Sequence, residues 1–262
     1  MNKKCVAIIF AVTMACVGLW AQNSEENLTG KQIMENVYNR KVPDDLQGNL
    51  KMILENERGD QRVREINQCI KSSGKDEKKI MFFTAPADVR DTSFMSWSYD
   101  DTSKDDSQWI YLPALKKIKR ISSSNSNDYF MGSDFTYDDL GTRNPEEDTH
   151  TLLRKETIDE KECYVIESIP LDKDTMYSKT ITWVLPSSWL GVKKEFYDED
   201  GELLKTLEIQ KVEEIKGYSV IASSLMTNVQ KNHTTQMQLS NLQVNTGIKD
   251  TIFSERIMMR GM

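Results

Sequence analysis

The sequence predicts a mostly β protein built on an antiparallel sheet. Roughly a dozen segments in which apolar and polar residues alternate recur between residues 50 and 244. Asp159-Glu160, Asp200-Gly201 and Lys216-Gly217 separate several of them and are typical of hairpin turns. Strands do not alternate with long amphipathic helices, which argues against a doubly wound sheet. The pattern therefore favours a β-sandwich or a β-barrel with few helices.

The first residues have the pattern of an export signal. Lys3 and Lys4 precede an apolar run from Val6 to Leu19, which is shorter than the about 20 residues of a transmembrane helix. The small residue Ala21 ends this stretch at a plausible cleavage point. We therefore expect a signal peptide at residues 1–21.

The remaining chain, residues 22–262, is expected to form one domain, because all-β domains commonly reach this length. An alternative at the N-terminus is lipidation of Cys16, although the apolar run continues to Ala21 beyond it. Either route takes the chain out of the cytoplasm.

Composition excludes one class of partner. The net charge of −7 disfavours nucleic acid, whose phosphates require a basic surface. Cys69 and Cys163 follow the signal segment at distant positions, and each lies in an alternating strand pattern. They either pair as a disulfide or are ordinary buried residues, and the sequence leaves both possibilities open.

The elements follow in order from the N-terminus. Thr29 precedes Ile33 and Val37, which share one face at helical spacing, so we expect a capped helix from Gly30 to Tyr38. Pro43 and the polar residues after it end this helix. The expected strands then cover residues 50–55, 61–70, 79–84, 92–99, 108–112, 116–121, 151–157, 162–169, 179–185, 191–197, 203–212, 218–229 and 234–244.

Few residues have the type and spacing that catalysis or metal binding requires. His150 and His233 stand alone at strand edges, without the spacing of a zinc site or a nucleophilic triad. The serines of residues 122–126 lack a nucleophile-elbow frame. The acidic residues 100–106 lack the glycine and distal glutamate of a calcium loop and are expected to form a solvated hairpin tip. We expect no catalytic residue, no metal and no cofactor; an enzyme acting on envelope lipids stays as an alternative.

Several strands are apolar on both faces. Trp109 and Tyr111 share one strand face while Ile110 and Leu112 lie on the other. Such a strand must be covered on both sides, by protein or by an apolar ligand. The interior is therefore either a closed core or a cavity lined by adaptable methionines, namely Met52, Met81, Met95, Met131, Met226 and Met237.

A basic strand follows the turn at Pro113. Lys117, Lys119 and Arg120 place cations on both faces of this strand. One interpretation is an exposed edge strand protected by lysines. The other is a docking strip for acidic lipid headgroups or for a partner protein.

Three blocks of sequence have counterparts in a known family. The first is the strand, Pro-centred turn and basic strand of residues 108–121, followed by Phe-Met-Gly-Ser-Asp-Phe-Thr-Tyr at residues 130–137. The second is Trp-Val-Leu-Pro at residues 183–186 with Gly-Val-Lys-Lys-Glu-Phe-Tyr-Asp at residues 191–198. The third is the closing segment 247–254. The chain resembles the LolA-like proteins, a group of outer-membrane-lipoprotein-sorting proteins.

The resemblance implies a LolA/LolB-like fold, in which a strongly curved antiparallel sheet forms an incomplete barrel with a helical lid and a hydrophobic cavity. It also implies a periplasmic, non-enzymatic carrier that transfers a lipid or a lipoprotein acyl chain, with an RND-type inner-membrane exporter as partner. A lipid- or envelope-stress-sensing module on the same fold is the alternative. The chain lacks an alignable counterpart of the founding carrier's cargo-binding arginine, so the cargo stays open.

On such a fold two groups of residues are candidates for the site. We expect Lys117, Lys119 and Arg120 to contact a headgroup or a partner. We expect the cavity or its rim to be lined by Trp109, Tyr111, Phe130, Phe135, Trp183 and Met95.

Overall fold

One continuous antiparallel sheet of thirteen strands dominates the computed structural model, which describes residues 28–261. The predicted signal peptide 1–21 and Cys16 lie outside the described residues. The strands are β1 (Asp45–Glu55), β2 (Gln61–Ser73), β3 (Asp76–Ala85), β4 (Ser93–Ser98), β5 (Ser107–Leu112), β6 (Lys117–Ile121), β7 (Asp148–Ile158), β8 (Lys161–Pro170), β9 (Lys179–Leu185), β10 (Leu190–Tyr197), β11 (Leu203–Ile215), β12 (Tyr218–Asn228) and β13 (His233–Val244).

The order of strands across the sheet is β6-β5-β4-β3-β2-β1-β13-β12-β11-β10-β9-β8-β7. Each strand therefore pairs with its neighbour in sequence, except that β1 also pairs with β13, and β6 and β7 lie at opposite edges. The two edges do not pair, so the sheet is not closed into a barrel. The predicted open antiparallel sheet is confirmed.

The chain between β6 and β7 must travel from one edge of the sheet to the other. Residues 122–147, called the crossing segment below, make this connection and contain four 3-10 turns: η2 (Ser123–Asn125), η3 (Phe130–Gly132), η4 (Asp138–Leu140) and η5 (Pro145–Glu147). The 3-10 turn η1 (Pro113–Leu115) joins β5 to β6.

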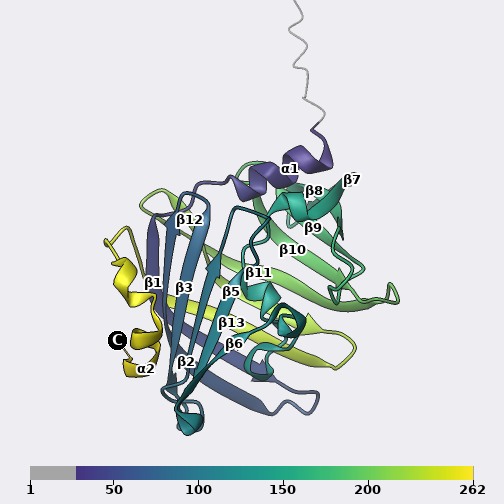
Figure 1. Ribbon diagram of the computed structural model, residues 1–262. Helices are drawn as coiled ribbons and strands as arrows, with labels where there is room; N and C mark the ends of the chain where they lie inside the picture. The colour runs from purple at the N-terminus through teal and green to yellow at the C-terminus, as the bar shows by residue number, and fades with distance from the viewer. Residues whose placement is uncertain (1–27, 262) are drawn as a thin grey trace, which may run out of the picture.

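The sheet bends over the crossing segment. Phe83 of β3 and Phe196 of β10 belong to one buried cluster although five strands lie between theirs in the sheet. Strands so far apart can share a core only if the sheet folds around it, and Figure 1 shows the two halves of the bent sheet facing each other. Phe130, Phe135 and Leu140 of the crossing segment fill the space between the halves. This side of the sheet is concave.

Helix α1 (Gly30–Tyr38) lies across one end of the concave side. Thr29 forms a capping box with Gln32, which satisfies free backbone N–H groups of the first turn, as its position before the apolar spacing predicts. Ile33 is fully buried against Ile166 of β8 and Val184 of β9. The helix and the crossing segment together cover the concave face, as the resemblance implies.

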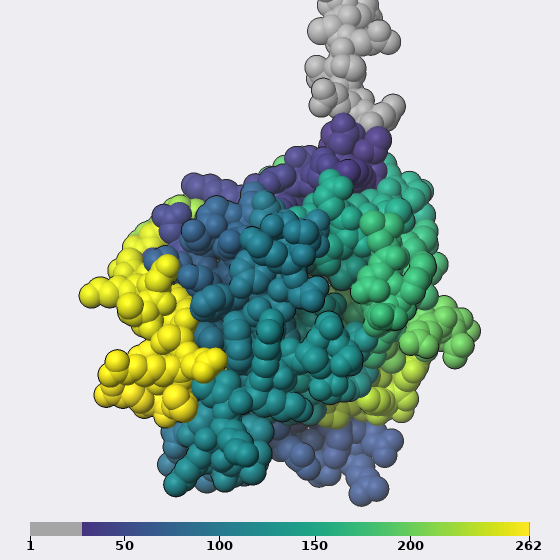
Figure 2. All heavy atoms as spheres, viewed as in Figure 1, coloured from purple at the N-terminus to yellow at the C-terminus, as the bar shows by residue number. Residues whose placement is uncertain are grey.

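The C-terminal segment covers the opposite, convex face. It contains η6 (Asp250–Ile252) and α2 (Glu255–Arg260), and Phe253 and Met258 pack on Ile80 and Met95. Lys71 of β2 binds the Asp250 carboxylate at 2.7 Å and so ties the segment to the sheet. In the space-filling view it forms a ridge along one side of the molecule (Figure 2). The strand pattern did not predict this layer.

The two cysteines left open by the sequence lie on opposite halves of the sheet. Cys69 of β2 is buried beneath the C-terminal segment, and Cys163 of β8 is buried in a separate cluster with Val165 and Trp183. No disulfide joins them.

The close contact between Gly30 of α1 and the backbone of β7 leads to a stability prediction. A Cβ at Gly30 would lie 2.7 Å from the backbone nitrogen of Leu152 and 2.8 Å from the carbonyl oxygen of His150. Gly30→Ala should therefore lift α1 from β7 and lower the free energy of unfolding by about 1–3 kcal/mol, although alanine favours helix. Urea unfolding measures this. Glu35→Ala, on a side chain 41% exposed, is the control, and equal stability of the two variants would contradict the packing argument.

Candidate functional site

The crossing segment places backbone carbonyls in the interior, where no neighbouring strand can satisfy them. Buried carbonyls need donors, and side chains of the concave face supply them. Lys79 of β3 donates to the Leu140 carbonyl at 2.7 Å, and Gln108 of β5 donates to that of Tyr137 at 2.8 Å. From the other half of the sheet, Lys205 of β11 donates to the Asp134 carbonyl at 2.9 Å. The segment is thus held from both halves.

Lys205 also forms the most deeply buried ion pair of the described residues. Its Nζ lies 2.6 Å from the Asp139 carboxylate, with the two side chains 0% and 7% exposed. Asp139 further accepts hydrogen bonds from the Thr136 backbone N–H and from the Tyr177 hydroxyl. The rings of Tyr129, Tyr177 and Phe196 lie 5.1–5.7 Å from the ammonium, which adds cation–π attraction. Burial, followed by the charge of Asp139, raises the pKa of Tyr177 and keeps it a neutral donor.

A second buried carboxylate fixes the middle of the segment. Asp134 accepts hydrogen bonds from His233 Nδ1 and from the Thr235 hydroxyl, both at 2.7 Å. Its backbone N–H donates to the Thr235 hydroxyl oxygen at 2.9 Å. Asp134 and Thr235 are buried, so these bonds form away from bulk water. The Gly-Ser-Asp element of the sequence therefore serves as an anchor between β13 and the crossing segment.

A cavity of about 220 Å³ remains between the crossing segment and the concave face, and is called the floor pocket; its lining is mainly apolar but includes Gln68, Lys79 and Asp139. Strands β1–β3 supply one wall and β12–β13 the other. Phe135 and Leu140 of the crossing segment close it from above. Its other apolar lining residues are Leu50, Ile70, Met81, Ile221, Ala222, Met237 and Leu239.

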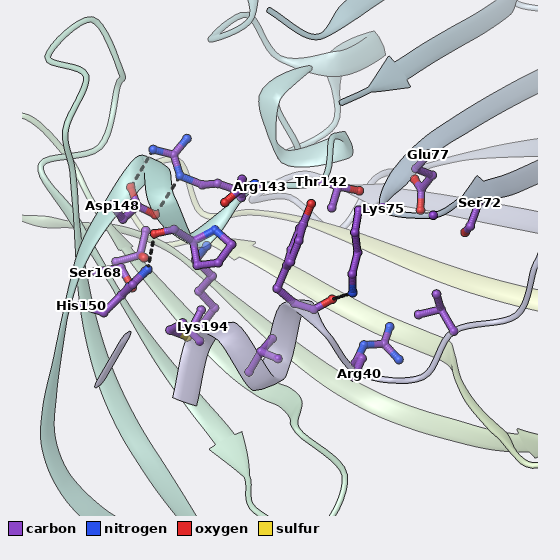
Figure 3. A pocket seen from close by; sticks show the side chains of 18 residues that line it. Arg40, Ser72, Lys75, Glu77, Thr142, Arg143, Asp148, His150, Ser168 and Lys194 are labelled. Atoms are coloured by element: carbon purple, nitrogen blue, oxygen red, sulfur yellow. Dashed lines mark hydrogen bonds and ion pairs between the residues drawn. The ribbon is translucent and has the colours of Figure 1, made fainter. Parts of the chain in front are cut away.

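A second cavity of about 270 Å³, called the helix pocket, lies beneath α1. Met34, Val37 and Tyr38 of the helix form its apolar side. The facing side is polar, and Figure 3 shows Lys194 and His150 on the strand side with Lys75 across from them. The charged lining residues are Arg40, Lys75, Glu77, Arg143, Asp148 and Lys194.

His150 holds one wall of the helix pocket. Its Nε2 lies 2.9 Å from the Pro145 carbonyl, which can only accept, so Nε2 carries the proton. Nδ1 then accepts from the Ser168 hydroxyl at 2.8 Å. Burial lowers the pKa of His150, and the hydrogen bond to the Pro145 carbonyl opposes this shift only in part, so the neutral ring is favoured.

The structure distributes the residues that the sequence proposed for the cavity over three clusters. Phe130 and Phe135 lie in the concave core, and Phe135 borders the floor pocket. Trp109, Tyr111 and Met95 lie on the convex face beneath the C-terminal segment. Trp183 lies on the convex face of β9, with Val165 and Cys163. Their part in ligand binding stays a prediction.

Lys117, Lys119 and Arg120 are exposed on β6 at the edge of the sheet. This location fits a lysine-protected edge. Contact with a headgroup or a partner stays a prediction for these residues.

Sequence reasoning missed Lys205 and Lys194. A β-bulge at β10–β11, where Phe196 pairs with Lys205 and Tyr197 with Leu203, inserts Leu204 as an extra residue. Both Leu204 and Lys205 then point inward, which strict alternation forbids. The position of Lys194 was easier to predict. Its spacing of two from Phe196 places both side chains on one strand face, so the aromatic residue was a usable signal that Lys194 points inward.

Two further features bear on chemistry. Within residues 28–261 no cluster of three or more histidine, cysteine, aspartate or glutamate side chains has the arrangement of a metal site. Neither α1 nor α2, the helices of this part of the chain, is long and apolar enough to span a membrane.

Known structures show the same architecture. A domain of an outer membrane lipoprotein-sorting protein from Vibrio parahaemolyticus is 32% identical, with a TM-score of 0.83 over 88% of this chain and 98% of that one. A DUF1329 family protein from Desulfovibrio piger is 28% identical, with a TM-score of 0.83 over 87% of this chain and 97% of that one. A LolA superfamily protein from Nitrosomonas europaea, 22% identical, shares the fold with a TM-score of 0.68 over 87% and 99% of the two chains.

The matching family model, over residues 75–260, is described only as an uncharacterized protein. No curated protein matches the chain.

The buried ion pair leads to a stability prediction. Lys205→Met leaves the Asp139 carboxylate buried without its cation and should lower the free energy of unfolding by about 3–5 kcal/mol. Adding Asp139→Asn removes the stranded charge and should recover part of the loss. Chemical unfolding of the wild type, of Lys205→Met and of the double variant measures these differences. Lys211→Met breaks an equally short pair, Lys211–Glu213 at 2.6 Å, that is 62% and 38% exposed, and should cost less than about 1 kcal/mol. A loss in Lys205→Met no larger than in Lys211→Met would overturn the anchoring role.

His150 leads to a prediction for pH. Because burial depresses its pKa in the folded state, the unfolded chain takes up a proton that the folded chain resists. The stability contributed by neutral His150 is therefore present above a pH of about 6.5 and is lost as the pH falls below it. His150→Gln keeps a donor and an acceptor but does not titrate. Urea unfolding at several pH values should show the stability advantage of the wild type shrinking on acidification, and a constant difference would exclude this linkage.

Proposed function

Because the chain belongs to the LolA-like family of outer-membrane lipoprotein-sorting proteins, we propose that it is a periplasmic carrier that binds a lipid or a lipoprotein acyl chain and transfers it between envelope components. The floor pocket is the observation that supports this function. It is a mainly apolar space on the concave face, bounded by the crossing segment and by both halves of the sheet. The proposed function needs no covalent step.

The energetics suit a reversible carrier. An acyl chain removed from water gains about 0.8 kcal/mol per buried CH₂ group. The floor pocket, at about 220 Å³, is smaller than the roughly 300–1,000 Å³ of typical ligand cavities. A long chain therefore has to displace Phe135 and Leu140, which close the pocket from above. Uptake exchanges one set of apolar contacts for another, so the free-energy change is small and release is possible.

The crossing segment is the proposed lid. Its apolar side chains refill the pocket when the ligand leaves, while the Lys205–Asp139 pair keeps it attached to β11. This arrangement limits the movement to side chains and to short stretches of backbone between the anchors. An RND-type inner-membrane exporter is the proposed partner, and co-purification of the two proteins from crosslinked cells tests that part.

A filled floor pocket should abolish transfer. Ala222 is 3% exposed and lines the pocket, so Ala222→Phe places a ring where the acyl chain is proposed to lie. We expect transfer of a fluorescent-acyl phospholipid between phosphatidylethanolamine/phosphatidylglycerol vesicles to slow about tenfold or more, the effect of losing roughly two buried CH₂ groups. Ala222→Ser, which keeps the volume, should transfer at the wild-type rate.

Three outcomes separate the alternatives. Wild-type transfer by a folded Ala222→Phe variant would remove the floor pocket from the function. Loss of transfer in Trp109→Ala instead would place the ligand beneath the C-terminal segment, where Trp109 lies. Tight binding of the lipid by the wild type without exchange between vesicles would favour a sensor over a carrier.

A further inference from the structure

The helix pocket carries more positive than negative charge. Arg40, Lys75, Arg143 and Lys194 line it, against two carboxylates, Glu77 and Asp148. Both carboxylates are already paired. Asp148 binds Arg143 through two hydrogen bonds at 2.7 and 2.9 Å, and Glu77 lies 3.2 Å from Lys79. The pocket thus has cationic capacity that its own acids do not neutralise.

Of the four cations that line the helix pocket, Lys194 is the least well paired with acceptors of the protein. Arg40 donates to the Ser219 carbonyl and Lys75 to that of Tyr38, whereas Lys194 makes no hydrogen bond or ion pair with the described residues. Its nearest interaction is with the Phe196 ring, 4.9 Å from Nζ.

The surroundings of Lys194 penalise its charge. Burial lowers its pKa, and the charges of Asp139 and Asp148 oppose that shift only in part. Asp139 belongs to Lys205 at 2.6 Å and Asp148 to Arg143. A half-buried cation without a hydrogen-bonding partner carries a desolvation cost, so an anion placed beside it would be bound favourably.

The helix pocket and the floor pocket lie in line along the same strand faces. On β2, Ser72 lines the helix pocket and Ile70 the floor pocket. On β3, Glu77 and Lys79 are divided in the same way. Residues two apart on a strand share a face and are about 7 Å apart. A single amphiphile can therefore reach both spaces.

From this arrangement we propose that the helix pocket binds the anionic headgroup of the amphiphile whose chain occupies the floor pocket, with Lys194 as the partner of its phosphate or carboxylate. This inference rests on the proposed function and adds the ligand class and its orientation. The apolar face of α1, with Met34 and Val37, would cover the first carbons of the chain next to the headgroup.

The test compares two ligands that differ only in the headgroup, dodecyl phosphate and dodecanol. The wild type should bind dodecyl phosphate more tightly. Lys194→Met, which keeps the length of the side chain, should weaken binding of dodecyl phosphate roughly tenfold or more, as expected for one hydrogen bond to a charged group, and leave dodecanol within about twofold. Ala222→Phe should weaken both ligands equally.

Lys193→Met is the matched control. Lys193 is the preceding residue but lies on the convex face, 4.3 Å from the Trp183 ring and 2.8 Å from Glu195. Removing its charge should leave the affinity for both ligands unchanged. If Lys193→Met weakens dodecyl phosphate as much as Lys194→Met does, the effect is one of overall charge and the assigned site is wrong.

The remaining outcomes distinguish the inference from the function on which it rests. Equal affinity for both ligands, with no selective loss in Lys194→Met, would overturn the headgroup site and keep the carrier. Binding of neither ligand would overturn both. Binding of inorganic phosphate as tight as that of dodecyl phosphate, and lost in Lys194→Met, would show a site for a free anion and overturn the amphiphile.

Discussion

The structure depends on how the chain crosses the inside of a bent, open sheet. The order of strands leaves β6 and β7 at opposite edges, so residues 122–147 must pass through the concave side without forming a strand of their own. A buried segment of this kind carries carbonyls that no sheet ladder satisfies. Long side chains from both halves of the sheet donate hydrogen bonds to these carbonyls, namely Lys79, Gln108 and Lys205. These three donors place polar side chains among the apolar residues of the concave face.

The same segment determines what space is left for a ligand. Phe130, Phe135 and Leu140 pack into the core on the concave side, and the floor pocket and the helix pocket are spaces left on that side. Because the crossing segment has apolar side chains and several polar anchors, it can yield locally without leaving the sheet. The floor pocket is mainly apolar, whereas the helix pocket beneath α1 is cationic. An amphiphile would therefore bind in one orientation, which a uniformly apolar cavity would not impose.

Much of the fold could be predicted because it is local. The alternation of apolar residues identified the strands, and Thr29 before Ile33 and Val37 identified α1 with its cap. The site was harder. Trp109 and Trp183 lie on strands that are apolar on both faces. The alternation of side chains along a strand predicts only that neighbouring residues point to opposite faces. Which face becomes concave depends on the bend of the whole sheet, and the C-terminal segment that covers the other face is paired with β2–β5 only in three dimensions.

The sequence by itself determined the strands, the turns between them, the capped helix and the family to which the chain belongs, because each depends on residues close together along the chain. Tertiary structure alone decided the inward turn of Lys205. The bulge at Leu204 depends on the register between β10 and β11, and the charge of Lys205 is tolerated inside only because Asp139 meets it from a distant segment. Long-range pairing of this kind has no local signature, since its energy comes from desolvation and charge shared between parts of the chain that are brought together only by folding.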